Sequence, residues 1–137
     1  MKKEAIGIRP GGAPVAVKVG SLVFLSGLDP MTPEAPGGIA APGDIAEQTE
    51  FVIEKLKRTI APMGCTLADV VKVTAFIDDM ADWATFNAAY NEHFPDDATR
   101  PARTTLQAGG FYKGMCVELD VVVLAPDDSA MGKHTEP

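Results

Sequence analysis

The chain has 137 residues and a hydrophobic content of 46%, which suits a single domain that buries about two thirds of its unfolded surface. Its net charge of −7 argues against a nucleic-acid surface, because such a surface needs clustered Lys and Arg to neutralise phosphates. Arg100 and Arg103 are the best candidates for a local cationic site. Cys65 and Cys116 belong to no Cys-x-x-Cys or Cys/His cluster, so neither a disulfide scaffold nor a zinc site is expected.

The N-terminal sequence lacks the apolar core of a signal peptide, and no apolar run approaches the ~20 residues that span a bilayer. These features predict a cytoplasmic protein without a membrane partner. Residues 1–137 are expected to form one domain, with its core at about 12–125 and a flexible tail at 126–137.

The first third of the chain is rich in turn residues. Residues 1–14 contain several glycines and prolines and are predicted to be irregular. Strands are predicted at 15–19 and 22–26, because Gly20-Ser21 between them suits a two-residue hairpin turn. Residues 27–43 form a long loop that either lines the mouth of a site or is disordered.

Two helices are predicted, separated by a strand at 70–77 that is rich in β-branched residues. Asp44 caps the first, with the Glu47 side chain reaching back, and its apolar residues recur at helical spacing up to Ile60. Asp78-Asp79 opens the second, whose aromatic residues recur every three or four positions. Asn87 lies beside that aromatic stripe, either as a satisfied buried amide or as part of a site.

The stretch from Arg100 to Asp120 reads as two extended segments joined by a Gly-rich turn, and an antiparallel pairing would bring them together. In the second segment apolar and polar residues alternate, so Glu118 points away from the core. Three interpretations stay open for Glu118: it lies on a solvated strand face, it pairs with Arg103 across the hairpin, or it belongs to a site.

The predicted order is β-β-α-β-α-β-β, an α+β fold with a mixed sheet and both helices on one face. Apolar residues such as Phe24, Val122 and Leu124 then lie on the other face, and self-association would cover them. No nucleophile is supported, because His93 and His134 are poorly placed to activate Ser26 or a cysteine. Acidic pairs read as caps and turn formers, so no metal site is expected.

Several short motifs in the expected order resemble the RidA (YjgF/YER057c/UK114) family over roughly residues 12–125. They are Ser26-Gly27, the strand 70–77 with Asp78-Asp79, Phe86-Asn87-Ala88-Ala89-Tyr90, Pro101-Ala102-Arg103-Thr104-Thr105 and Val117-Glu118-Leu119. The resemblance implies a chorismate-mutase-like fold, a homotrimer with pockets between subunits, and hydrolysis of reactive enamine or imine acids, such as 2-aminoacrylate, to 2-oxo acids and ammonia without a cofactor.

By the same resemblance, Arg103 binds the substrate carboxylate and Glu118 positions or deprotonates the attacking water. The substrate-binding positions implied or inferred are Ser26, Gly27, Asn87, Thr105 and Tyr112. The chain departs from the family at Ala13, Thr105 and Phe111-Tyr112, which leaves the substrate open; aminomuconate or 3-aminoacrylate are alternatives, and Phe111 or Tyr112 is a candidate aromatic wall. A non-catalytic trimer that binds small ligands is a second reading, and a ribonuclease is a third that the net charge disfavours.

Overall fold

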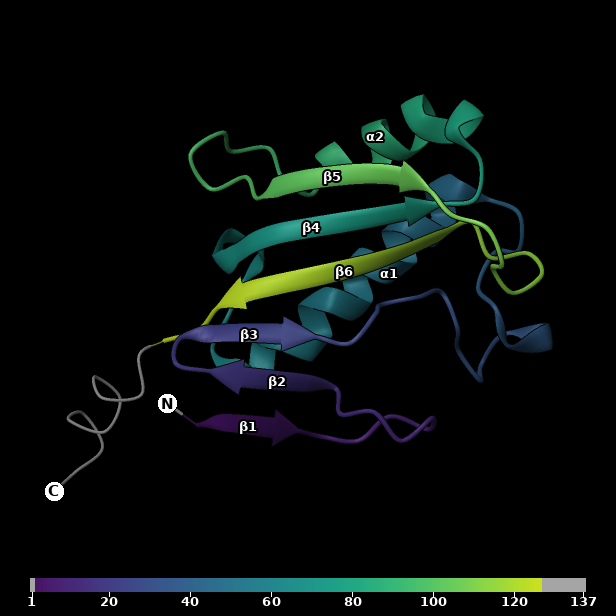
Figure 1. The fold of residues 1–137 in the computed structure, drawn as a ribbon. Coiled ribbons are helices and arrows are strands. Elements are labelled where there is room, and N and C mark those ends of the chain that lie inside the picture. The colour runs from purple at the N-terminus through teal and green to yellow at the C-terminus, as the bar shows by residue number, and fades with distance from the viewer. Residues whose placement is uncertain (1, 127–137) are drawn as a thin grey trace, which may run out of the picture.

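The computed structural model describes residues 2–126, which form a six-stranded sheet with two helices on one face (Figure 1). The strands are β1 (Lys3–Ile6), β2 (Ala16–Val19), β3 (Leu22–Leu25), β4 (Val70–Ile77), β5 (Ala102–Gln107) and β6 (Val117–Leu124). The helices are α1 (Ile45–Ile60) and α2 (Trp83–Asn91). The predicted α+β class, mixed sheet and placement of the helices are confirmed. The predicted tail lies outside the described residues, apart from Pro126.

The strand order is β1-β2-β3-β6-β4-β5, in which β4 and β5 are parallel and the other neighbouring pairs are antiparallel. The connections β3-α1-β4 and β4-α2-β5 both return the chain in the same direction, as crossovers through a helix do. Each crossover brings its helix to the same face, so α1 and α2 lie side by side behind the sheet (Figure 1).

Local signals explain the best-predicted elements. Gly20 has a φ of 60° in the two-residue turn between Val19 and Leu22, which is a backbone conformation that favours glycine. The Asp44 side chain accepts a hydrogen bond from the Glu47 backbone N–H and so caps α1. The predicted apolar stripe of α1 is buried against the sheet, and each large aliphatic side chain buried in this way stabilises the fold by about 1.5–3 kcal/mol.

The sequence-based prediction was wrong about the pairing of the last two strands. β5 does not pair with β6; it pairs with β4, and β6 lies between β3 and β4. The inward side chains of β6 are Val117, Leu119, Val121 and Val123, all fully buried, which suits a strand with neighbours on both sides. In β5 the polar sequence Arg-Thr-Thr suits the edge of a sheet.

Two further boundaries differ from the predictions. Lys3–Ile6 forms the edge strand β1 although residues 1–14 were expected to be irregular, because pairing with β2 orders a segment that has no apolar alternation. Asp79 caps a short 3-10 turn, Met80–Asp82, and α2 begins only at Trp83. Among residues 2–126, no helix is both long enough and apolar enough to cross a membrane.

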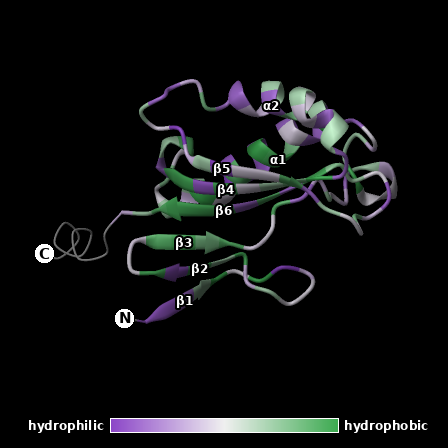
Figure 2. Cartoon of the chain, turned by 45° about the horizontal axis from the view of Figure 1, so that its top comes forward, coloured by the Kyte–Doolittle hydropathy of each residue, from purple (hydrophilic) through white to green (hydrophobic). Residues whose placement is uncertain are grey.

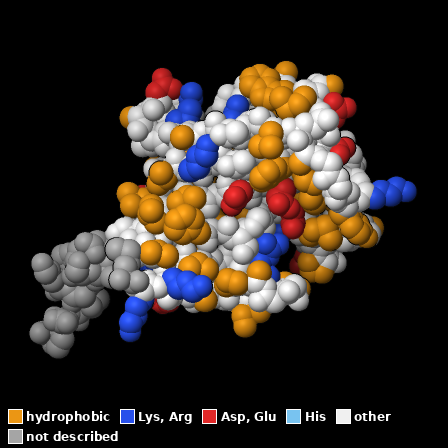
Figure 3. Space-filling view, viewed as in Figure 1, with side chains coloured by type: hydrophobic (Ala, Val, Ile, Leu, Met, Phe, Trp, Pro, Cys, Tyr) orange, Lys and Arg blue, Asp and Glu red, His pale blue; other side chains and the backbone are white. Residues whose placement is uncertain are grey.

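The two faces of the sheet differ in their surroundings. The helix-covered face holds the core, and Figure 2 shows hydrophobic residues along the central strands. The other face, here called the open face, is not covered by any element of residues 2–126, and Figure 3 views it directly. Phe24 is 45% exposed and Leu124 is 50% exposed on neighbouring strands of this face. A sheet face of this kind is a candidate surface for self-association.

Candidate functional site

Arg103 lies on the helix-covered face of β5, beneath α2. It is opposite Val73 of β4, a fully buried core residue, so the two side chains share that face. The guanidinium carbon lies 4.7 Å from the centre of the Tyr90 ring and 5.5 Å from that of Phe86. These distances are those of cation–π contacts, which support the guanidinium without neutralising it. No carboxylate among residues 2–126 forms an ion pair with Arg103.

Asn87 orients this guanidinium. The Nη2 group of Arg103 donates a hydrogen bond of 2.7 Å to the Asn87 side-chain oxygen. One amide oxygen occupies only part of the five-donor fork, so the remaining N–H groups stay available for a carboxylate. Thr105 lies on the same face two residues further along β5, and its hydroxyl is buried without a hydrogen-bond partner in residues 2–126. Arg103, Asn87 and Thr105 are here called the anchor cluster.

Glu118 lies on the open face of β6, opposite Phe76 of β4. Gly27, which follows the end of β3, lies directly against it. A Cβ atom built on Gly27 would be 3.0 Å from Oε2 of Glu118, so glycine leaves the room that this carboxylate occupies. Ser26 is adjacent, but its hydroxyl donates to the Pro14 carbonyl at 2.6 Å and is therefore engaged. Glu118, Gly27 and Ser26 are here called the hydrolytic cluster.

Burial raises the pKa of Glu118 above the ordinary glutamate value, and the negative charge of Asp29 raises it further, while Arg9 opposes the shift. A carboxylate whose pKa is raised above the ordinary value is a stronger base than an exposed one, and it can also return the proton. The environment of Glu118 therefore suits proton transfer with a bound water.

The two clusters are far apart within one chain. β4 separates β5 from β6, and the registers place Arg103 opposite Val73 but Glu118 opposite Phe76, three residues further along. These offsets correspond to about 10 Å across the sheet and about 10 Å along it, and the two side chains project from opposite faces. The predicted alternative that Arg103 pairs with Glu118 across a hairpin is therefore wrong. A single copy does not bring the anchor cluster and the hydrolytic cluster together.

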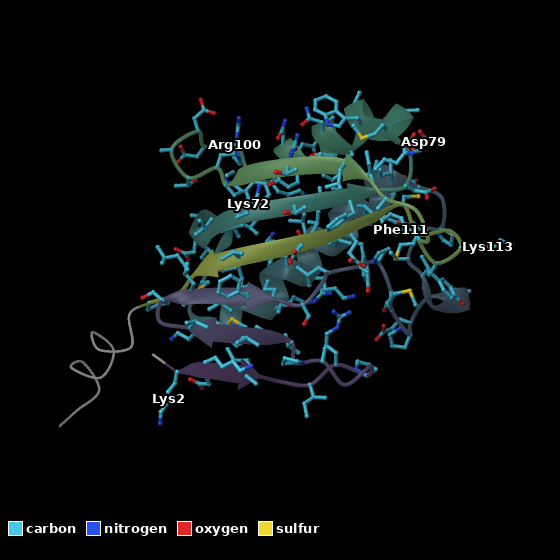
Figure 4. The ribbon with its side chains drawn as sticks, viewed as in Figure 1. Lys2, Lys72, Asp79, Arg100, Phe111 and Lys113 are labelled. Atoms are coloured by element: carbon cyan, nitrogen blue, oxygen red, sulfur yellow. The ribbon has the colours of Figure 1, made fainter. Side chains whose placement is uncertain are left out.

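The residues predicted to form an aromatic wall, Phe111 and Tyr112, lie in the loop between β5 and β6. Tyr112 is 61% exposed in the loop between β5 and β6, and Figure 4 shows neighbouring Phe111 at the end of the sheet where β6 begins. Within residues 2–126, Tyr112 forms no hydrogen bond with either cluster, so its assignment to the site remains a prediction. The Arg100 side chain already has two polar partners: it donates a hydrogen bond to the Phe94 carbonyl at 2.8 Å and pairs with Asp97 at 3.2 Å.

Sequence reasoning missed a charged network beside the hydrolytic cluster. Arg9 donates to the Gly27 carbonyl at 2.6 Å and lies 3.3 Å from Asp29. Lys55 of α1 reaches the same Asp29 side chain at 3.3 Å and its carbonyl at 2.8 Å. A cavity of about 150 Å³ is lined in part by Arg9, Gly27 and Lys55. The one available sequence signal was an arginine within a turn-rich segment, which by itself indicates no partner.

One other group of residues has ligand-type side chains. Glu50, Glu54 and His93 bring possible ligand atoms within 4.8 Å of one another on the helical layer. His93 is 2.6 Å from Glu50, and Glu54 is 3.0 Å from Lys57, so each side chain already has a polar partner. Glu50 and Glu54 lie on α1 and His93 lies in the turn after α2, away from the open face that carries Glu118.

Comparisons with known proteins identify the family. The family model described as Endoribonuclease L-PSP matches residues 13–125. A RutC family protein of Pyrococcus abyssi is 35% identical over 89% of this chain and 97% of its own length. "Putative reactive intermediate deaminase TdcF" of Escherichia coli is 33% identical over 79% of this chain and 82% of its own length.

Solved structures agree with the sequence comparisons. A crystal structure of a YjgF family member from Neisseria meningitidis is 27% identical and superposes with a TM-score of 0.77, covering 93% of this chain and 98% of its own. The matched sheet and helices are the chorismate-mutase-like fold that the sequence predicted. The chain belongs to the RidA (YjgF/YER057c/UK114) family, whose model carries the Endoribonuclease L-PSP description.

Proposed function

We propose that this protein hydrolyses reactive enamine and imine acids to 2-oxo acids and ammonia. The observation that carries the proposal is a guanidinium, Arg103, that is half-buried and supported by aromatic rings and Asn87 but has no acidic partner in the described residues. Such a group binds a carboxylate through two parallel charge-assisted hydrogen bonds, each worth about 1.5–3 kcal/mol. The named deaminase among the relatives supports the same chemistry.

The reaction requires the protein to position the substrate and a water molecule and to transfer protons between them. The enamine first tautomerises to the imine, whose C=N carbon is electrophilic. Glu118 takes a proton from water as the water oxygen bonds to that carbon, the C=N π electrons move to nitrogen, and Glu118 then gives this proton to the nitrogen, which restores its carboxylate. Collapse of this carbinolamine expels ammonia as the C–O bond becomes C=O, and Glu118 relays the proton that leaves the oxygen to the departing nitrogen. Anchoring the acid through Arg103 makes the addition effectively intramolecular.

The proposal requires two copies of the chain at each site. Arg103 lies at an edge strand on the helix-covered face, whereas Glu118 lies on the open face, so the edge of one copy would have to meet the open face of the next. That contact joins two different surfaces, and such heterologous contacts form a ring when the rotation between successive copies closes. A homotrimer satisfies this geometry and also covers the exposed Phe24 and Leu124 of the open face.

Two other functions lead to different outcomes. A ligand-binding trimer without catalysis would bind small 2-oxo or amino acids at Arg103 but leave imines unchanged. A ribonuclease, as the family model's description suggests, would have to bind a polyanion with a chain whose net charge is −7. RNA binding that persists at moderate salt would be needed to support it.

The direct test generates imino acids in place with an amino-acid oxidase and traps them with semicarbazide. Added wild-type protein is expected to lower the yield of the semicarbazone, and Arg103→Ala is expected to abolish this effect. Arg100→Ala is the matched control, because Arg100 lies three residues away and is occupied by Phe94 and Asp97. Ligand binding with no change in the trapped yield would instead support the regulatory trimer. Varying the amino acid supplied to the oxidase maps the accepted side chains.

A further inference from the structure

Arg9 connects the N-terminal segment to the residue that packs against Glu118. Its backbone is held in a closed turn, since its N–H donates to the Ala13 carbonyl at 2.7 Å and its carbonyl accepts from Gly12 at 2.9 Å. From this turn the side chain extends to the Gly27 carbonyl, at 2.6 Å. Only about a third of the Arg9 side chain is exposed, at 34%, so the contact is partly shielded from water.

Gly27 transmits this contact to Glu118. Its carbonyl is held by Arg9, while the position that a Cβ would occupy lies 3.0 Å from Oε2 of Glu118. A shift of the Gly27 backbone would therefore either crowd the carboxylate or release it. A one-ångström displacement of a reacting group is enough to lower a rate substantially, so this packing bears directly on catalysis.

Glu118 lies near two other acidic side chains, and a nearby cation would offset their negative charge. Asp29 faces it from the loop after β3, and Asp120 lies two residues along β6 on the same face. Lys72 of β4 also lies on this face, but it donates to Thr104 at 2.7 Å (Figure 4). Lys55 reaches Asp29 from the helix side. Arg9 is the cation that contacts both Asp29 and the Gly27 backbone.

We propose that Arg9 is a positioning residue for the hydrolytic cluster: it clamps Gly27 against Glu118 and pairs with Asp29, so that the Glu118 carboxylate stays in place. This inference rests on the proposed function for the role of Glu118. Arg9 acts through Gly27 and through its charge, without touching the substrate. Space-filling Figure 3 shows acidic and basic side chains next to one another on this face.

The test compares Arg9→Gln, which removes the charge, with Arg9→Lys, which keeps it. In Arg9→Gln, kcat/KM for imine hydrolysis is expected to fall about tenfold at the acidic side of the pH profile, and the acid limb is expected to move to higher pH. Arg9→Lys is expected to recover most of the rate. Lys57→Ala is the control, because Lys57 pairs only with Glu54 on α1, and its profile should match that of the wild type. A lowered Tm with an unmoved acid limb would overturn the proposal and leave Arg9 a purely structural role.

A second readout does not depend on turnover. Carbon-13 NMR titration of the Glu118 carboxyl should give a higher pKa in Arg9→Gln than in the wild type, because burial and Asp29 then act without an opposing cation. If the wild type hydrolyses no imine, the proposed function fails while this titration still decides the inference. If the titration is the same in both proteins, Arg9 does not control Glu118 and the inference fails.

Discussion

The anchor cluster and the hydrolytic cluster differ in how the fold supports them. Arg103 is held on the helix-covered face by Asn87 and by the rings of Phe86 and Tyr90, a rigid apolar setting beneath α2. Glu118 lies on the open face against Gly27, where the charge of Arg9 favours its ionised form and that of Asp29 opposes it. Aromatic packing thus supports the anchor cluster, whereas opposing charges surround the hydrolytic cluster.

This difference has a consequence for assembly. Within residues 2–126, the anchor cluster offers a cation without an acidic partner, whereas the cations near the hydrolytic cluster, Arg9 and Lys72, already have partners. Each supplies what the other lacks, and they project from opposite faces of one sheet. We therefore expect catalysis to depend on contact between copies. Variants of either cluster and variants of the open face both test this dependence.

The largest effect is expected from removing the anchor. Arg103→Ala should lower kcat/KM for imine hydrolysis by about 100- to 1,000-fold, since two charge-assisted hydrogen bonds to the substrate carboxylate are lost. The trapping assay measures this loss, and Arg100→Ala should stay within about twofold of the wild type. Equal losses in both variants would show that general positive charge, and not the Arg103 geometry, attracts the substrate.

A charge on the open face is expected to separate the copies. Phe24→Glu would place a carboxylate on the apolar surface that the proposed self-association would bury, so light scattering should report a smaller species and activity should fall in proportion to the assembly lost. Thr85→Glu adds the same charge on exposed α2 and should leave the assembly unchanged. A Phe24→Glu protein with unchanged mass would mean that the open face is not the contact surface.

Removing the hydrogen bond that orients Arg103 should lower kcat/KM less than removing Arg103 itself. Asn87→Ala deletes the 2.7 Å hydrogen bond that orients the guanidinium while leaving the charge and the aromatic support intact. We expect kcat/KM to fall about tenfold, equivalent to about 1.4 kcal/mol, which is close to the lower limit of about 1.5 kcal/mol for a charge-assisted hydrogen bond. Unchanged kinetics would assign Asn87 to the alternative role of a satisfied buried amide.

The smallest effect concerns stability. Because the pKa of Glu118 is raised above the ordinary value of 4.5, the folded state binds this proton more tightly than the unfolded state does. The free energy of unfolding should therefore fall as pH rises from about 4.5 through the raised pKa, and this part of the fall should be absent in Glu118→Gln. Urea denaturation at pH 4 and pH 8 measures the difference, and exposed Glu92→Gln should behave like the wild type.

Much of the fold was predictable because its signals are local. The α1 stripe, the Asp44 cap and the alternation in β6 each depend on residues close in sequence, and each is confirmed. The strand pairing was not predictable in this way. Gly109-Gly110 suggested a hairpin between β5 and β6. In the structure, β6 instead pairs with β3 along one edge and with β4 along the other.

The sequence offered candidate residues for the site but not their arrangement. Family motifs indicated Arg103, Asn87, Gly27 and Glu118, yet the polar sequence of β5 does not reveal which face Arg103 occupies. Arg9 was missed because it meets Gly27 across 18 residues, with no periodicity that could indicate the contact. Long-range polar contacts of this kind depend on the register of the whole sheet.

The most direct test of the central claim mixes two inactive variants, Arg103→Ala and Glu118→Gln, refolded together in equal amounts. In a cyclic assembly with sites between copies, about one quarter of the sites combine an intact Arg103 from one copy with an intact Glu118 from the next. Imine hydrolysis should therefore recover to about a quarter of the wild-type rate, whereas the double variant mixed with either single variant stays inactive. No recovery in mixtures shown to contain hybrid assemblies would contradict a site shared between copies.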